Sequence, residues 1–87
     1  MNIGGKYMNV ALSKSAAKTL DALDKPTQAR IIAGLEKLPA GDVKPLRGSD
    51  GDYRLRIGDW RILFSYADHD TIRIKRIAPR GGAYKGV

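Results

Sequence analysis

Apolar and polar residues alternate along the segment DYRLRIGDWRILF, which spans residues 52–64. A period of two is typical of a β-strand with one buried face, because successive side chains point to opposite sides of a sheet. The Gly58-Asp59 pair between the two halves is a two-residue connection that can join antiparallel strands. We therefore predict a β-hairpin here, followed after the polar turn ADHD by a further strand over residues 71–78.

Two helices are predicted before the hairpin. Ser13 suits an N-cap, and apolar residues follow it at helical spacing. This helix should end near Asp24, because Pro26 disfavours helical geometry in the residue that precedes it. Pro26 is in turn well placed in the first turn of a second helix, which Pro39 and Gly41 should end. Each predicted helix has one apolar face, so the antiparallel pair must pack on another part of the chain.

The predicted order of elements is β-α-α-β-β-β, with a short first strand over residues 8–13. Because strands and helices do not alternate, this order indicates an α+β fold, with a helical hairpin on one face of a mainly antiparallel four-stranded sheet. We expect a single domain over residues 1–87, with residues 1–7 as a flexible leader, Met8 as an alternative start, and a loop over residues 41–51. The strand residues expected to face the helices are Tyr53, Leu55, Ile57, Ile62, Phe64, Ile72 and Ile74.

Three arginines occupy the other face of the predicted hairpin: Arg54, Arg56 and Arg61. Like charges that face one another across strands destabilise a sheet, so a sequence selected only for folding would mix the signs there. One explanation is that this face binds an anionic partner. The alternative is that acidic residues at the ends of the hairpin neutralise the arginines: Asp50, Asp52 and Asp59.

The composition favours an anionic partner. Sixteen Lys and Arg against nine Asp and Glu give a net charge of +7 and a pI near 10.0. From Lys44 onward, ten basic residues oppose five acidic ones, a net charge of +5, and seven of the ten are arginines. Arginine contacts phosphate through two parallel hydrogen bonds and stacks on bases, which favours nucleic acid. A solvated basic surface is the alternative explanation of the charge alone.

Several other classes of protein are excluded by the sequence. The chain has no cysteine, which excludes a disulfide scaffold and a thiolate zinc site and suits a reducing cytoplasm. Its apolar runs are too short to cross a bilayer, and its N-terminus lacks the apolar core of a secretion signal. We therefore expect a cytoplasmic protein that uses neither a membrane nor a cofactor.

The chain ends in APRGGAYKGV, which places Arg80 and Tyr84 just beyond the last predicted strand. Gly81 and Gly82 would let the backbone turn back toward the sheet. If the tail folds over the open face, Arg80 and Tyr84 join the hairpin arginines in one basic concavity. Guanidinium groups can hold RNA phosphates there, while a phenol can stack on a base or exchange a proton.

The element order, the LRG before the hairpin, YRLRIGDWRILF and the final PRGGAY together resemble the RelE/ParE superfamily of bacterial toxin–antitoxin toxins. The similarity runs from about Met8 to Tyr84, and the terminal Arg and Tyr resemble the RelE-like ribonuclease branch. This resemblance implies a toxin that cleaves mRNA in the ribosomal A site without metal, through attack of a 2′-hydroxyl on the adjacent phosphate. It also implies a neutralising antitoxin, an acidic and partly disordered protein that folds on binding.

The same resemblance implies roles for the site residues. Arg61 and Arg80 would stabilise the extra negative charge of the phosphorane, and Tyr84 would act as general base or as a stacking platform. The family often has lysines at the positions of Arg54 and Arg56, and arginine is a poor general acid or base. The residues expected to bind RNA are Arg54, Arg56, Lys44 and Arg47.

Two other functions are compatible with the sequence. ParE-type toxins share the fold and the hairpin but bind DNA gyrase and do not cut RNA; the joint presence of Arg61, Arg80 and Tyr84 favours the nuclease. A non-catalytic RNA-binding module would use the same basic face, because positive charge and stacking serve both activities.

Three further residue types are interpreted as structural. His69 lies in the predicted ADHD turn, away from the arginine face, and is expected to be a solvated turn residue. Together with Asp68 and Asp70 it is too weak a signal to predict a metal site. Trp60 could stack on RNA, but we expect it to cap the helix–sheet interface as a partly buried core residue.

Overall fold

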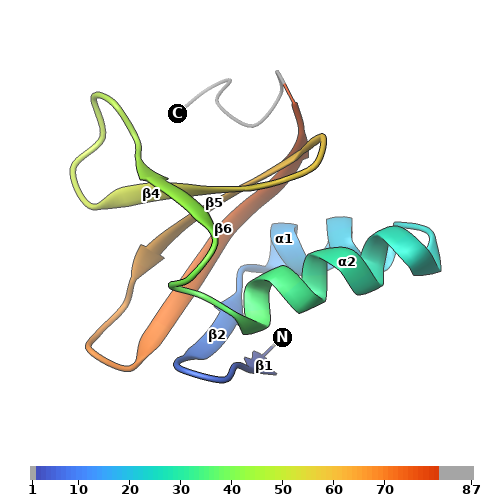
Figure 1. Ribbon diagram of the computed structural model, residues 1–87, viewed down its shortest axis with the longest axis horizontal. Helices are drawn as coiled ribbons and strands as arrows, with labels where there is room; N and C mark the ends of the chain where they lie inside the picture. The colour runs from blue at the N-terminus through green and yellow to red at the C-terminus, as the bar shows by residue number, and fades with distance from the viewer. Residues whose placement is uncertain (1, 81–87) are drawn as a thin grey trace.

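The computed structural model describes residues 2–80, which form two layers (Figure 1). Helices α1 (Lys14–Asp21) and α2 (Lys25–Glu36) lie on one face of a six-stranded sheet. The strands follow the order β1-β2-β6-β5-β4-β3, and β2 pairs with β6 in parallel while all other neighbours are antiparallel. The predicted α+β fold is confirmed. The strands are β1 (Asn2–Gly4), β2 (Asn9–Leu12), β3 (Asp42–Pro45), β4 (Asp52–Ile57), β5 (Trp60–Tyr66) and β6 (Thr71–Pro79).

The prediction of a four-stranded sheet was wrong, because two short edge strands extend it to six. Strand β1 lies within residues 1–7, which were expected to be a flexible leader, and pairs with β2. The N–H of Lys6 then donates to the carbonyl of Glu36 at 2.9 Å, so this segment is also attached to the end of α2. Strand β3 lies in the predicted loop over residues 41–51 and pairs with β4. β1 has only three residues, and β3 has a single apolar residue, Val43, before Pro45, so neither displays an alternating pattern.

Both helices begin with a side-chain cap. The hydroxyl of Ser13 accepts a hydrogen bond from the N–H of Ala16 at 3.0 Å, which confirms the predicted N-cap. Asp24 caps α2 in the same way, accepting from the N–H of Thr27 at 3.2 Å. Because Asp24 belongs to the start of the second helix, the first ends earlier than expected, at Asp21.

The core lies between the helices and the sheet. Apolar residues of both helices pack onto the strand residues that were predicted to face them. Trp60 is partly buried against this core, which confirms its structural interpretation. Within residues 2–80, no helix is long and apolar enough to span a membrane. Of the predicted core residues, Leu55, Ile62, Phe64, Ile72 and Ile74 are buried, and Tyr53 and Ile57 are partly buried.

A β-bulge in β6 changes which side chains face the helices. On β5, Leu63 lies opposite Arg76, but the next residue, Phe64, lies opposite Ile74. Lys75 is therefore an extra residue that has no partner in the register, and it reverses the phase of the strand. As a result Ile77, not Arg76, continues the buried row begun by Ile72 and Ile74.

Candidate nucleic-acid interface

The three hairpin arginines lie on the face of the sheet opposite the helices. Leu55 and Ile62 pair on the helical face, so the neighbouring pairs, Arg54 with Leu63 and Arg56 with Arg61, lie on the open face. This placement agrees with the alternation of the sequence. The bulge adds Arg76 to the same face, opposite Leu63.

Arg54 and Arg56 share one carboxylate, and it is not one of the three that the alternative explanation named. Asp42, on edge strand β3, lies opposite Arg56 in the register. Its Oδ2 is 2.7 Å from Nε of Arg56, and its Oδ1 is 3.4 Å from Nη1 of Arg54. Partial desolvation alone would raise the pKa of Asp42, but the charges of Arg56 and Arg54 outweigh it, and the pKa is lowered.

The acidic residues that the alternative explanation invoked do not pair with the hairpin arginines within residues 2–80. The carboxylate of Asp52 accepts from Nζ of Lys75 at 2.7 Å and from the hydroxyl of Ser49 at 2.6 Å. The ion pairs among the described residues do not include Asp50 or Asp59. The alternative that these three acids neutralise the hairpin arginines is therefore wrong, because the partner carboxylate is Asp42, on a strand that the sequence did not reveal.

The side chain of Arg61 and the backbone of Arg80 both lie at the hairpin turn. Nη1 of Arg61 donates to the carbonyls of Gly58 at 2.9 Å and Trp60 at 3.1 Å, so its guanidinium covers the turn. The backbone N–H of Arg80 donates to the carbonyl of Asp59 at 2.7 Å, which brings the end of β6 beside the same turn. The guanidinium of Arg61 and the backbone of Arg80 therefore lie at the same turn.

Arg56 and Arg61 face each other across the strands but bind different acceptors. Arg56 turns to the carboxylate of Asp42 on one side, and Arg61 turns to the turn carbonyls on the other. Charge-assisted hydrogen bonds of this kind offset part of the repulsion between two guanidiniums in a cross-strand pair. The sheet thus tolerates two positive charges at neighbouring positions.

Lys44 and Arg47 extend the basic surface toward the sheet edge. Lys44 lies opposite Arg54 on β3, and Arg47 is exposed in the loop between β3 and β4. Together with Pro45, Leu46 and Arg54 they line a shallow pocket of about 350 Å³. The predicted RNA-binding residues are therefore neighbours.

Tyr84 lies outside the residues that the structure describes, so its predicted role at the site stays a prediction. Arg76 and Asp42 are two residues of the open face that sequence reasoning missed. For Arg76 a signal exists, because the buried isoleucines at 72, 74 and 77 change their spacing from two to three. For Asp42 there is none, since its partners lie on a different strand and more than ten residues away along the chain.

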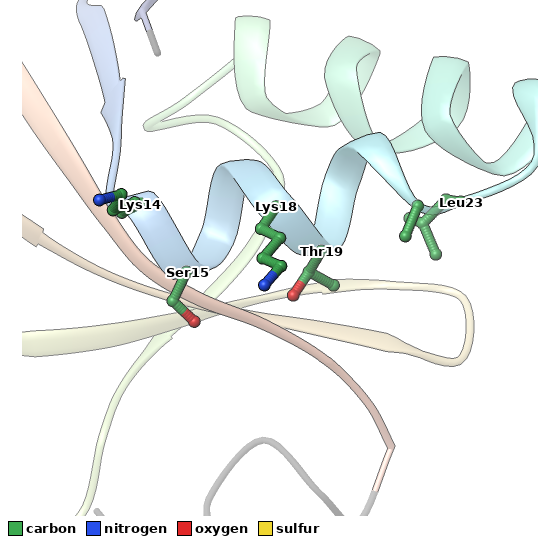
Figure 2. A pocket seen from close by; sticks show the side chains of 6 residues that line it. Lys14, Ser15, Lys18, Thr19 and Leu23 are labelled. Carbon is green, nitrogen blue, oxygen red and sulfur yellow. The ribbon is translucent and has the colours of Figure 1, made fainter.

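A second concave surface runs along the outer side of α1 (Figure 2). It is lined by Lys14, Ser15, Lys18, Thr19, Ala22 and Leu23. No carboxylate or imidazole is among these residues, so this surface lacks the usual groups for proton transfer near neutral pH. Its polar side chains are two lysines, a serine and a threonine, so it differs from the arginine cluster of the open face.

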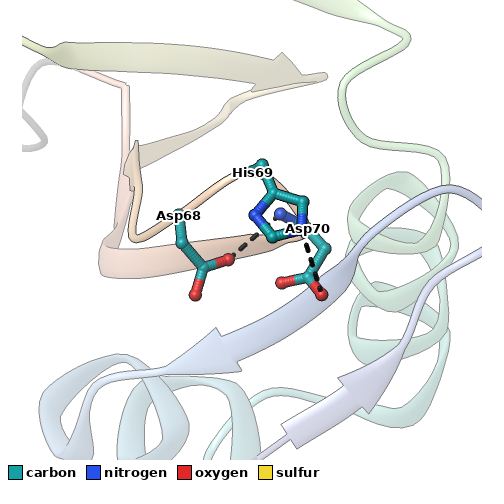
Figure 3. A group of neighbouring side chains, drawn as sticks. All are labelled: Asp68, His69 and Asp70. Carbon is teal, nitrogen blue, oxygen red and sulfur yellow. Dashed lines mark hydrogen bonds and ion pairs between the residues drawn. The ribbon is translucent and has the colours of Figure 1, made fainter.

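Figure 3 shows the turn between β5 and β6, where Asp68, His69 and Asp70 cluster. All three side chains are exposed, and Nε2 of His69 lies 4.0 Å from Oδ2 of Asp70. Their potential ligand atoms lie within 4.8 Å of one another, but the N–H of Asp70 already donates to the carboxylate of Asp68. The expectation of a solvated turn histidine is confirmed.

The sequence matches a known protein family over nearly its whole length. Residues 10–84 match the family described as the ParE toxin of the type II toxin–antitoxin system, parDE. The chain belongs to this ParE toxin family. The resemblance to the RelE/ParE superfamily is thereby confirmed, and the protein is the toxin of a toxin–antitoxin pair.

This chain is also similar to proteins that are named RelE or RelBE. The RelE1 protein of Methanocaldococcus jannaschii is 34% identical over 85 residues, which cover 88% of this chain and 94% of the relative. The structure of the toxin–antitoxin complex RelBE2 from Mycobacterium tuberculosis matches with a TM-score of 0.72 and 28% identity, covering 85% of this chain and 98% of that one. The archaeal RelE–RelB complex from Pyrococcus horikoshii OT3 matches with a TM-score of 0.70 and 31% identity, covering 88% and 99%.

Proposed function

We propose that this toxin is a metal-independent endoribonuclease that cleaves mRNA in the A site of the ribosome. The observation that carries the proposal is that Arg61 and the backbone of Arg80 lie at the same hairpin turn, with Arg56 directly opposite Arg61. Three guanidinium-bearing residues at one end of an open sheet face suit a phosphate that gains negative charge during a reaction. The resemblance of the hairpin and tail to the RelE-like branch supports the same activity.

The proposed reaction uses a nucleophile that the RNA itself supplies. The 2′-hydroxyl attacks the adjacent phosphorus, its oxygen forms the new P–O bond, and the bond to the 5′-oxygen breaks. The products are a 2′,3′-cyclic phosphate and a 5′-hydroxyl, and the proton lost from the 2′-oxygen is balanced by one delivered to the 5′-oxygen. Arg61 and Arg80 would stabilise the phosphorane, an electrostatic contribution that is often the largest in such sites.

Tyr84 is proposed to act on the 2′-hydroxyl as general base or to stack on a base of the mRNA. An ordinary tyrosine, with a pKa near 10, is a weak base at neutral pH. Nearby guanidiniums would favour the phenolate and so strengthen it as a base. Ordering of the mRNA by the ribosome would supply the remaining alignment.

The test is translation of a defined mRNA in vitro with purified toxin, followed by mapping of the new 5′ ends by primer extension. We expect cuts at A-site codons with the wild-type toxin. Arg61→Ala, Arg80→Ala and Tyr84→Ala should each lower the cleavage rate by about 100-fold or more, the typical effect of losing one stabilising donor or one acid–base group.

Lys25→Ala is the matched control for loss of one positive charge, because Lys25 is exposed at the start of α2 on the helical side of the sheet. It should cleave like the wild type. Intact mRNA in every reaction, from a toxin that still arrests cell growth, would refute the nuclease. Cuts that persist in the Arg80 and Tyr84 variants would show that the site lies elsewhere.

A second candidate function is binding to DNA gyrase without RNA cleavage. The match to the ParE family description favours it, because ParE-type toxins share this fold and hairpin. A supercoiling assay with purified gyrase separates the two candidates. Inhibition of supercoiling by a toxin that leaves translated mRNA intact would select the gyrase-binding function.

The proposed partner is a cognate antitoxin, since two of the similar structures are toxins solved in complex with an antitoxin. An acidic segment that folds on binding would complement the net charge of +7. The second proposed partner is mRNA on the ribosome, which would place the active toxin in the cytoplasm.

A further inference from the structure

The two predicted RNA-binding arginines of β4 have different surroundings. The side chain of Arg54 is 16% exposed, whereas that of Arg56 is 55% exposed. A donor must be accessible to reach a phosphate of a bound strand. Although they are only two residues apart on the same face of β4, the two arginines are therefore not equivalent.

One nitrogen of the Arg54 guanidinium contacts a single residue of the edge strand. Its Nη1 donates to the backbone carbonyl of Asp42 at 3.2 Å and contacts Oδ1 of the same residue at 3.4 Å. One guanidinium nitrogen thus contacts both the backbone and the side chain of Asp42. This contact fixes the rotamer of the carboxylate and links β3 to β4 beyond the backbone ladder.

The other oxygen of this carboxylate holds Arg56. Oδ2 of Asp42 lies 2.7 Å from Nε of Arg56, which is the nitrogen nearest the aliphatic stem. A contact at Nε restrains the rotation of the guanidinium, and more than half of the side chain is still exposed. The exposed guanidinium is thereby held in one orientation before any ligand arrives, which lowers the entropic cost of binding.

We propose that Arg56 is the residue of this pair that contacts an RNA phosphate, and that Arg54 and Asp42 are positioning residues that hold its guanidinium. The inference rests on the proposed function, because it concerns the same RNA-binding face. It assigns different roles to two arginines for which the sequence predicts the same role. It also gives an acidic residue a supporting role on a surface that binds an anion.

The test is binding of a fluorescein-labelled single-stranded RNA 12-mer, measured by anisotropy over a series of salt concentrations. One phosphate contact contributes about 0.7 to the slope of log K against log salt concentration for single strands. Arg56→Ala should reduce the slope by about this amount, whereas Arg54→Ala should leave the slope unchanged and weaken binding at fixed salt about threefold. Lys37→Ala, which removes one exposed positive charge at the end of α2, is the control for both.

Arg54→Lys keeps the charge if Arg54→Ala fails to fold. A lysine would still serve as a phosphate contact but cannot reproduce the two contacts to Asp42, so we expect the same weakening of about threefold. Two results would overturn the division of roles. One is an equal reduction of the salt-dependence slope in Arg54→Ala and Arg56→Ala, and the other is wild-type RNA affinity in Arg54→Lys.

Asp42→Asn separates positioning from simple neutralisation. The substitution adds one positive charge to the face, so neutralisation alone predicts tighter binding and a steeper salt dependence. The positioning role predicts no gain in affinity, because Arg56 loses its anchor. Asp50→Asn makes the same charge change at an exposed loop residue and is the matched control.

The binding assay needs no ribosome, so its outcome is independent of whether the toxin cleaves mRNA. Unequal slopes for Arg54→Ala and Arg56→Ala, without cleavage of translated mRNA, would support the division of roles and refute the enzyme. Cleavage at A-site codons with equal slopes would support the enzyme and refute the division. A wild-type toxin that binds no RNA would overturn the inference outright.

Discussion

The ammonium group of Lys75 lies 2.7 Å from Oδ1 of Asp52, and this ion pair joins the bulge of β6 to the first residue of β4. β5 lies between these strands, so the two side chains reach across it on the open face. The hydroxyl of Ser49 donates to the other oxygen of Asp52 at 2.6 Å. The carboxylate of Asp52 thus links the loop before β4 to β6.

Asp52→Asn should lower the free energy of unfolding by about 1 kcal/mol at pH 7, at the upper end for partly exposed ion pairs. Lys75, then Ser49, lower the pKa of Asp52 by hydrogen bonding, so its stabilising contribution is present above the unfolded pKa of about 3.9. This contribution is lost as the pH falls through the lower pKa of the folded state. Denaturation by urea at several pH values should therefore show the difference between wild type and variant shrinking below about pH 4. A difference that stays constant down to pH 2 would contradict this assignment.

Ser13→Ala should destabilise the toxin by about 1–2 kcal/mol, because one hydroxyl has two structural partners. It accepts from the N–H of Ala16 as the cap of α1, and it donates to the carbonyl of Lys75 at 3.0 Å. Ser13→Thr keeps both bonds and should retain most of the stability in a thermal melt. Ser13→Asp keeps the cap but has no proton to donate, so it should fall below Ser13→Thr. Equal stability of Ser13→Asp and Ser13→Thr would show that the bond to Lys75 contributes nothing.

Gly34→Ala should destabilise the protein in spite of the higher helix propensity of alanine. A Cβ on Gly34 would overlap Cδ1 of Ile57, where α2 packs closely on β4. We expect a loss of about 1 kcal/mol, within the range for overpacked sites. Ile57→Val removes the overlapping atom, so the double variant should be more stable than the sum of the single changes predicts. Strict additivity in urea denaturation would refute the close contact.

Leu63→Ala should cost about 2 kcal/mol although Leu63 points away from the helices. This side chain is only 4% exposed, and the register places it between Arg54 and Arg76 on the open face. Arginine stems can cover apolar surface while their charged ends stay in water. Ser65→Ala, at the next open-face position of β5, is the control and should change stability by less than about 0.5 kcal/mol. A neutral Leu63→Ala variant would mean that this burial contributes no stability.

Local signals in the sequence determined the helical pair, the central hairpin and the side of the sheet on which each hairpin residue lies. The cap at Ser13 depends on contacts within one helical turn, and the alternation from Tyr53 to Phe64 depends on the pleat of a strand. Such features need no knowledge of distant residues. For the same reason the placement of Arg54, Arg56 and Arg61 on the open face could be predicted.

Pairing between distant segments decided the rest. β1 and β3 form because their backbones pair with β2 and β4. With one apolar residue each, Ile3 and Val43, they have no alternating pattern from which a strand could be predicted. The contact of Asp42 with Arg56 depends on that pairing, as does the extra residue Lys75 that turns Arg76 to the open face. Period and capping are properties of a short segment, whereas register and bulges are set by the free energy of the whole sheet. Only the tertiary structure could therefore show that Asp42 holds two of the hairpin arginines and that Arg76 joins them on the open face.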